Sequence, residues 1–145
     1  MRNLNVYQCK SKLLPGHKYG DVLKIARKIL NSIASKTKRR PYIRSTYFKG
    51  EKIFLDNFWE HLTQKNITDR KWRLKFLECA IEYIENSKDS PILKINDNHQ
   101  TFYRFIGQVG EHFFAIQIKE DLKRKQKFLM SIFDLSHKRN NPQPR

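Results

Sequence analysis

Hydrophobic positions near the C-terminus of the chain recur with a period of two. Residues 101–109, 112–120 and 127–133 are short runs rich in aromatic and β-branched side chains, separated by Gly110 and by a charged loop. Such alternation is typical of strands with one buried face, and short breaks between the runs favour hairpins. The pattern predicts an antiparallel meander of three strands.

The same alternation predicts which side chains share a face of the meander, because successive side chains of a strand point to opposite sides. We expect a core face with Phe114, Ile116, Ile118, Phe128, Met130 and Ile132. The opposite face would carry Phe113, Ala115, Gln117, Lys119, Lys127, Leu129 and Ser131. An ordinary amphipathic sheet has the same pattern, so alternation by itself does not select a functional site.

Helical periodicity precedes the meander. One apolar face begins at Tyr19, and a second covers residues 51–65. A third helix is predicted from Thr68, whose hydroxyl suits an N-cap, to Asn86. Apolar residues at intervals of three and four along these segments indicate helices that bury one side.

The remaining segments complete the predicted fold. Residues 42–48 interleave aromatic and basic side chains and predict a further strand, whereas residues 93–100 are expected to form a polar loop. The fold class is then α+β, with the N-terminal helices packed on one face of a four-stranded antiparallel sheet. We expect residues 1–18 to form a basic N-terminal arm, residues 19–133 a single domain, and residues 134–145 a disordered tail.

Charge changes this picture, because the chain of 145 residues has a formal net charge of +16. The first fifty residues hold thirteen Lys and Arg against the single acid Asp21. Such a field attracts polyanions. Cys9 and Cys79 lie far apart and lack metal-ligand spacing, and no apolar leader or membrane-length run is present. We therefore expect a cytoplasmic protein that does not enter a membrane.

Basic residues concentrate in two places that suit an RNA contact. The first is the run of Lys38, Arg39 and Arg40, followed by Tyr42 and Arg44, which add stacking surface and phosphate-binding groups. The second is the start of the third helix, where Arg70, Lys71 and Arg73 oppose the helix dipole. Solvated surface charge explains either cluster equally well.

The chain lacks the motifs of several common enzyme classes. It has no Gly-rich phosphate loop, no nucleophile elbow and no clustered metal ligands, so we expect neither a metal nor a cofactor. Metal-free cleavage remains chemically accessible for RNA, whose ribose 2′-OH is a built-in nucleophile. Groups suited to the required proton transfer and charge stabilisation are His61, Arg70, Arg73, Gln117, Lys119 and Ser131.

Four segments resemble the barnase/EndoU/colicin/RelE-like (BECR) nuclease superfamily, in particular its branch associated with phages and mobile elements. They are residues 40–48 (RPYIRSTYF), 52–62 (KIFLDNFWEHL), 69–74 (DRKWRL) and 127–133 (KFLMSIF). The resemblance implies a metal-independent, toxin-like ribonuclease domain, with an acidic antitoxin or immunity protein as a possible partner. It also implies that His61 is the catalytic histidine, that Arg70 and Arg73 are the basic residues after it, and that Gln117, Lys119 and Ser131 are polar groups on the strands.

Three hypotheses stay open at this point. In the first, the protein is a ribonuclease with His61 as proton-transfer group, and its RNA target is a tRNA or an mRNA. In the second, it is a non-catalytic RNA- or DNA-binding module, for which charge and surface suffice. In the third, it is an interaction or inhibitor protein that binds an acidic partner. A packed, structural role for His61 is as compatible with the helix pattern as a catalytic one.

Overall fold

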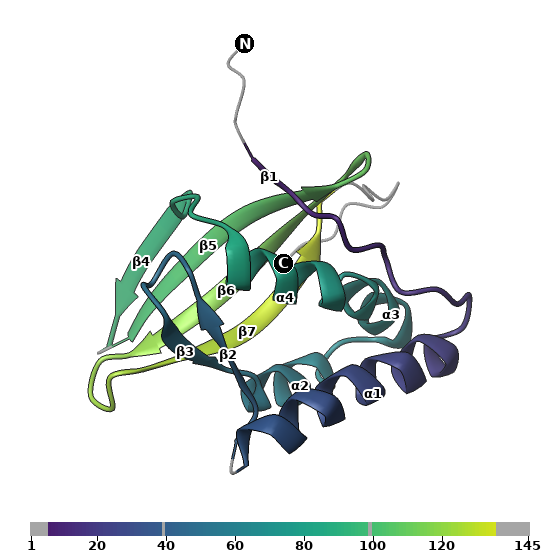
Figure 1. The fold of residues 1–145 in the computed structure, drawn as a ribbon, viewed down its shortest axis with the longest axis horizontal. Coiled ribbons are helices and arrows are strands. Elements are labelled where there is room, and N and C mark those ends of the chain that lie inside the picture. Colours follow the sequence, from purple (N-terminus) through teal and green to yellow (C-terminus); the bar gives the residue numbers. More distant parts are fainter. Residues whose placement is uncertain (1–5, 39, 99, 136–145) are drawn as a thin grey trace.

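The computed structural model describes residues 6–38, 40–98 and 100–135, which form one curled, mixed sheet with helices packed against it (Figure 1). In chain order the elements are β1 (Tyr7–Gln8), α1 (Tyr19–Thr37), β2 (Tyr42–Ser45), β3 (Glu51–Phe54), α2 (Asp56–Leu62), α3 (Ile67–Lys75), α4 (Leu77–Asn86), β4 (Leu93–Asp97), β5 (Gln100–Val109), β6 (His112–Asp121) and β7 (Gln126–Asp134). The α+β class is confirmed.

The sheet itself differs from the prediction. It has seven strands in the order β1-β5-β6-β7-β3-β2, and β4 also pairs with β5. The β5–β6–β7 meander is antiparallel as predicted, but β1 pairs with β5 and β3 with β7 in parallel. The predicted four-stranded antiparallel sheet is therefore wrong in strand number and in strand direction.

The largest error concerns the segment predicted as one helix over residues 51–65. A turn with positive φ at Lys49 and Gly50 folds β3 back onto β2, so that Ile43 pairs with Ile53. The helix α2 begins only at Asp56. Apolar residues at the start of this segment fit a strand and a helix equally well, and pairing with β2 and β7 selects the strand.

Other predicted boundaries also shift. The expected polar loop contains β4, which is exposed along its whole length and pairs with β5 through its backbone, so no buried alternation marks it. The predicted third helix is two helices, α3 and α4, which meet at Phe76. Asn66, rather than Thr68, is the N-cap of α3, because its side chain accepts a hydrogen bond from the Asp69 N–H at 2.8 Å.

A β-bulge interrupts the pairing of β6 with β7. Gln117 lies opposite Ser131, but the next residue, Ile118, lies opposite Leu129. Strand β7 therefore holds one extra residue, Met130, at this point. Because a shift of one residue exchanges the two faces of a strand, side chains on the two sides of the bulge follow opposite alternations.

Because of the bulge, residues of β7 before Met130 point to the opposite face from the one predicted. Phe128 pairs with Lys119 on the face away from the helices, whereas Leu129 and Lys127 point to the helix side. Consistent with this, Phe128 is buried but does not belong to the main core cluster, which includes Leu129. The predicted face is wrong for these three residues, although the predicted burial of Phe128 is confirmed. Met130, also predicted to be buried, lies at the bulge and is only partly buried, whereas the burial of Ile132 in the core is confirmed.

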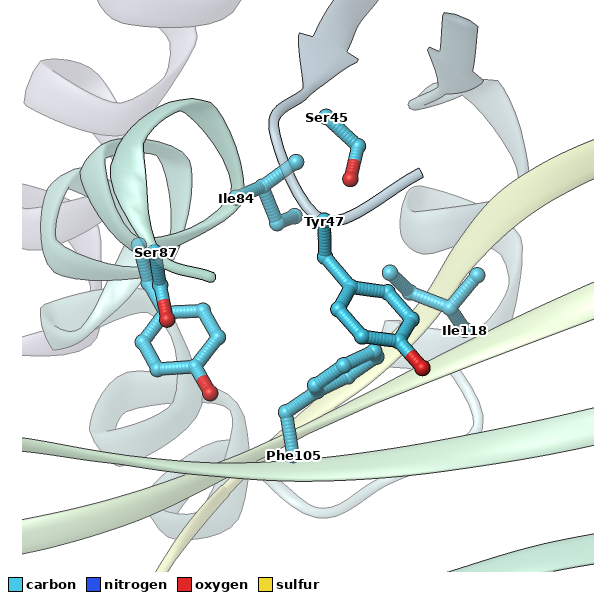
Figure 2. A pocket seen from close by; sticks show the side chains of 7 residues that line it. Ser45, Tyr47, Ile84, Ser87, Phe105 and Ile118 are labelled. Atoms are coloured by element: carbon cyan, nitrogen blue, oxygen red, sulfur yellow. The ribbon is translucent and has the colours of Figure 1, made fainter. Parts of the chain in front are cut away.

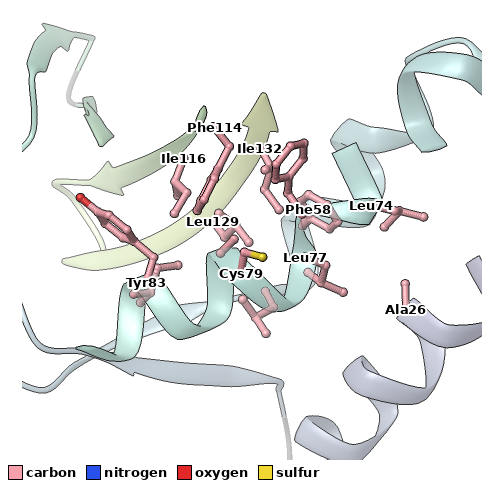
Figure 3. Packing of buried hydrophobic residues seen from close by; sticks show 14 of the residues in the cluster. Ala26, Phe58, Leu74, Leu77, Cys79, Tyr83, Phe114, Ile116, Leu129 and Ile132 are labelled. Atoms are coloured by element: carbon pink, nitrogen blue, oxygen red, sulfur yellow. The ribbon is translucent and has the colours of Figure 1, made fainter. Parts of the chain in front are cut away.

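The core lies between the helices and one face of the meander (Figure 3). Its sheet side is formed by Phe105, Phe114, Ile116, Ile118, Leu129 and Ile132, and the helices contribute Ala26, Phe58, Leu74, Leu77 and Tyr83. Rings of α4 and the sheet interlock, with Tyr83 edge-on to Phe114 at 6.3 Å between centroids. The predicted burial of Phe114, Ile116 and Ile118 is confirmed.

Of the segment expected as an N-terminal arm, residues 6–18 are described; they pack against the domain and bury Leu14 in its core. Strand β1 places Tyr7 opposite Gly107 of β5. The Glu82 carboxylate of α4 accepts hydrogen bonds from the backbone N–H groups of Lys10 and Ser11 and from the Tyr7 hydroxyl. Of the expected tail, Asp134 ends β7, and residues 136–145 lie outside the described residues. No helix in the described ranges is both long and apolar enough to cross a membrane.

Candidate functional site

A row of polar side chains crosses the sheet on the face away from the helices, which we call the open face. Arg104 of β5 lies opposite Gln117 of β6, and Gln117 lies opposite Ser131 of β7. Directly paired residues of antiparallel strands project from the same face. The predicted residues Gln117 and Ser131 are therefore neighbours, and Arg104 joins them.

Arg73 reaches this row from α3, which packs along the edge of β7. Its Nη1 donates to the Ser131 Oγ at 2.6 Å and to the Ile132 carbonyl at 3.2 Å. Its Nε lies 3.3 Å from the Asp69 carboxylate, and its side chain is only 11% exposed. Strand β3 pairs with β7 only at Lys127 and Phe128. Farther along β7 the Arg73 guanidinium bonds Ser131 and Ile132 instead, and it brings a fixed positive charge to Ser131.

A second guanidinium converges on the same place. Arg104 donates from Nη2 and Nε to the Gln117 Oε1, at 2.8 and 3.3 Å. The guanidinium carbons of Arg104 and Arg73 lie 4.9 and 4.8 Å from the centroid of the Phe133 ring. Two cations held on one aromatic ring repel each other, and an anion between them relieves that repulsion. The arrangement is suited to bind a phosphate.

His61 projects from α2, which packs against β7. The side chain is half-buried and does not belong to the fully buried core. Partial burial lowers the pKa of His61 below its ordinary value of 6.5, and the positive charges of Lys65 and Arg73 lower it further. The imidazole is therefore neutral at neutral pH and can accept a proton. The influence of Arg73 also places His61 within electrostatic range of the group that binds Ser131.

Lys119 lies on the open face two residues beyond Gln117. Its Nζ is 5.6 Å from the centroid of the Phe128 ring, on the strand that also carries Ser131. The ammonium and the Ser131 hydroxyl therefore project from the same side of the sheet. Of the five predicted catalytic residues, Gln117, Lys119 and Ser131 share the open face, and Arg73 reaches Ser131 from α3. His61 lies on α2, which packs against β7.

The predicted RNA-binding residues divide into two groups. Arg70 donates to the backbone carbonyls of Thr63 and Lys65, and Lys71 donates to that of His17, so both hold other parts of the chain. Lys38 is exposed just after α1, and Arg39 lies outside the described residues. Arg40, Tyr42 and Arg44 gather instead at the β2 end of the sheet.

The cavity in Figure 2 does not coincide with this row. It lies between α4, β2 and the sheet, and is lined by Ser45, Tyr47, Tyr83, Ile84, Ser87, Phe105 and Ile118. Its volume of about 10 Å³ admits roughly one water molecule and no larger ligand. Within the described residues, no three His, Cys, Asp or Glu side chains are placed to hold a metal ion.

Sequence reasoning missed Arg104 and Phe133 as members of the row. Arg104 could have been found, because the turn at Gly110 fixes the β5–β6 register, which pairs Arg104 with Gln117. The position of Phe133 beside both arginines depends on the bulge and on α3, which leave no local signal.

Comparison with known proteins found no matching family model, no matching curated protein and no matching solved structure.

Proposed function

We propose that the protein is a metal-independent endoribonuclease that acts on RNA in the cytoplasm. The observation that carries this proposal is the hydrogen bond from Arg73 to Ser131, together with the half-buried imidazole of His61, whose pKa the charge of Arg73 helps to lower. Arg73 thus bonds a hydroxyl on β7 and acts electrostatically on a proton acceptor on α2. These are the groups that cleavage of RNA through its own 2′-OH requires.

The proposed reaction begins when His61 removes the proton from the ribose 2′-OH. The 2′-oxygen attacks the adjacent phosphorus, and the bond from phosphorus to the 5′-oxygen breaks. A water molecule gives a proton to the leaving 5′-oxygen and takes one from the protonated His61, so the water is regenerated and the imidazole returns to its neutral form. The products are a 2′,3′-cyclic phosphate and a free 5′-OH, with no change in oxidation state and no co-reactant.

The other side chains act on the charge that develops at phosphorus. Arg73 and Arg104, held 4.8 and 4.9 Å from the Phe133 ring, provide two guanidinium groups for the non-bridging oxygens. Lys119 adds a third cation, and Ser131 and Gln117 orient the phosphate. Electrostatic stabilisation of this kind is commonly the largest contribution to catalysis, and removal of one donor costs on the order of 100-fold in rate.

A second candidate function is RNA binding without cleavage. It is favoured by the cations that lie over aromatic rings elsewhere on the open face, including Arg40 over Phe54 at 4.1 Å. Such pairs provide affinity for nucleic acid and need no proton transfer. This candidate predicts that His61 is dispensable.

The test is an incubation with total RNA in EDTA, followed by analysis of the product ends. The ribonuclease proposal predicts cyclic phosphate ends from the wild-type protein, and loss of cleavage in His61→Ala and Lys119→Ala without loss of fold. The exposed residues His17 and Lys24 provide matched controls, because His17→Ala and Lys24→Ala remove the same groups elsewhere. RNA binding with no cleavage by the wild type would support the second candidate instead.

A further inference from the structure

A strip of aromatic rings continues the open face beyond Lys119, across β7, β3 and β2. Phe128 pairs with Phe54, and Phe54 pairs with Tyr42, so the three rings project from one side of the sheet. Their centroids are 5.9 Å apart between Phe128 and Phe54 and 6.0 Å apart between Phe54 and Tyr42. The rings form a continuous floor over three neighbouring strands.

Four cations lie on this floor. The guanidinium of Arg40 is 4.1 Å from the Phe54 centroid and 5.6 Å from that of Phe128. Lys52 and Arg44 lie over Tyr42, at 4.6 and 5.5 Å. Lys119 lies over Phe128 at 5.6 Å. We call these four cations and the three rings Tyr42, Phe54 and Phe128 the cationic track.

The charges of the cationic track are poorly balanced. Among the described residues, the only carboxylate paired with any of its four cations is Asp56, which binds Arg40 at 2.8 Å. Lys52 and Arg44 are exposed and lie over the same ring. Like charges so close together repel each other, so the arrangement favours a polyanion as its occupant.

The geometry of the cationic track suits a single strand better than a duplex. Phe128 is covered by Arg40 and Lys119, whereas Tyr42 is partly exposed and can stack on a base. A duplex hides its base faces, but unpaired nucleotides offer both a base to the ring and a phosphate to the cations. From β7 to β2 the sheet extends about 10 Å, the reach of a few nucleotides.

We propose that the cationic track binds the single-stranded RNA next to the phosphate held at Ser131. The inference rests on the proposed function, which fixes where the RNA continues from the cationic track. Lys119 belongs both to the proposed cleavage site and to the track, so the RNA would pass from one to the other at this residue. It assigns a substrate class, unpaired RNA of several nucleotides. It also gives Lys52, Phe54 and Phe128 a role that neither charge nor spacing in the sequence indicated.

The test measures binding without cleavage, so that it is independent of the proposed chemistry. The probe is a fluorescent octanucleotide with 2′-O-methyl groups throughout, which has no nucleophilic 2′-OH. The double variant Arg44→Gln/Lys52→Gln is compared with Lys24→Gln/Lys28→Gln, which removes the same charge from two exposed positions of α1. Thermal melting establishes that both variants are folded.

We expect the Arg44→Gln/Lys52→Gln variant to bind the probe about tenfold more weakly than wild type. Log affinity should also depend less steeply on log salt, with a slope smaller in magnitude by about 1.4 for two lost phosphate contacts. The α1 variant should stay within about twofold of wild type. Equal weakening by both variants would overturn the inference, as would equally tight binding of a duplex of the same length. Failure of the wild type to cleave RNA would refute only the proposed function.

A second measurement does not depend on any variant. The octanucleotide is made with 5-iodouridine and cross-linked by light to the wild-type protein, and the modified peptide is identified by mass spectrometry. Cross-links at Tyr42 or Phe54 are expected. Cross-links only at aromatic residues of the helices, such as Trp72, would contradict the inference.

Discussion

At the scale of single residues, the account depends on the protonation of His61. Partial burial disfavours the charged imidazole, and the nearby charges of Lys65 and Arg73 disfavour it further. A pKa below 6.5 means that the base form predominates at neutral pH and that cleavage is lost as the pH falls through the lowered value. The side chain is suited to be a base because partial burial, and then the charges of Lys65 and Arg73, disfavour its protonated form.

The variant Arg73→Gln should move the pKa of His61 upward, toward 6.5, because it removes one of the two positive charges that lower it. The titration is followed by NMR of the imidazole ring. Arg124→Gln, at the exposed loop after β6, is a control that should leave the midpoint unchanged. An unchanged midpoint in Arg73→Gln would show that the two side chains do not interact.

The backbone at Gly107 lies so close to two core rings that there is no room for a side chain. A Cβ at this position would lie 2.6 Å from Cζ of Phe114 and 2.8 Å from Cδ2 of Tyr83, both in the core. We expect Gly107→Ala to lower the free energy of unfolding by about 1–3 kcal/mol, measured by denaturant titration. Gly20→Ala in α1 meets nothing within 4 Å and should be neutral or slightly stabilising. Equal effects would contradict the packing described.

At the scale of elements, the sequence pattern predicted a helix or strand correctly where one face of the segment is buried and the other is exposed. The strands β5, β6 and β7 alternate and were found, and so was the amphipathic helix α1. β4 is exposed throughout, and β3 is a strand of four residues with only two apolar side chains, so their pairing depends on partners outside each segment. The missed β3 also explains why Lys52 was not recognised as a neighbour of Arg44.

The β2–β3 hairpin is fixed to the meander by Lys127. Its Nζ bonds both oxygens of Glu51 at 2.8 and 2.9 Å and lies 3.4 Å from Glu120, and its side chain is only 8% exposed. Lys127→Ala leaves two carboxylates facing each other and should cost about 1–3 kcal/mol of unfolding free energy.

The exposed pair of Arg124 and Asp121 is the matched control for Lys127. Its side chains are 71% and 21% exposed, so Arg124→Ala should change the unfolding free energy by less than about 0.5 kcal/mol. Denaturant titration of both variants tests the comparison. A smaller loss in Lys127→Ala than in Arg124→Ala would show that the buried ammonium does not hold the hairpin.

The N-terminal segment is held to α4 through Glu82. Burial alone would raise the pKa of this carboxyl, but hydrogen bonds from Lys10, Ser11 and Tyr7 lower it below its ordinary value of 4.5. Because the folded pKa is lowered, this contribution to stability is present above 4.5 and is lost as the pH falls through the folded pKa.

Glu82→Gln should therefore speed amide hydrogen exchange at Lys10 and Ser11 by at least about fivefold, since a neutral amide accepts these bonds more weakly. Glu78→Gln, an exposed change on the same helix, should leave exchange unaltered. Protection of both amides at the wild-type level in Glu82→Gln would contradict this attachment.

At the scale of the whole molecule, the two faces of the sheet differ in what they contact. One face packs the core against α4, and the other leaves Arg104, Gln117 and Lys119 available. The net charge of +16 attracts polyanions, and the open face carries the groups that we propose to hold RNA. The attraction of polyanions stays a prediction from composition, whereas strand alternation predicted part of the open face that the structure shows. The bulge and the approach of Arg73 along β7 could be seen only in three dimensions.

The most direct measurement of the central claim uses two oligonucleotides of the same sequence in EDTA, one of RNA and one with 2′-deoxy sugars at every position. Wild-type protein should cleave the RNA, leave a 2′,3′-cyclic phosphate and leave the deoxy strand intact, although both bind. His61→Ala should bind both strands and cleave neither. Cleavage of the deoxy strand, or undiminished cleavage of RNA by His61→Ala, would contradict an RNA-cleaving site built around His61, Arg73 and Ser131.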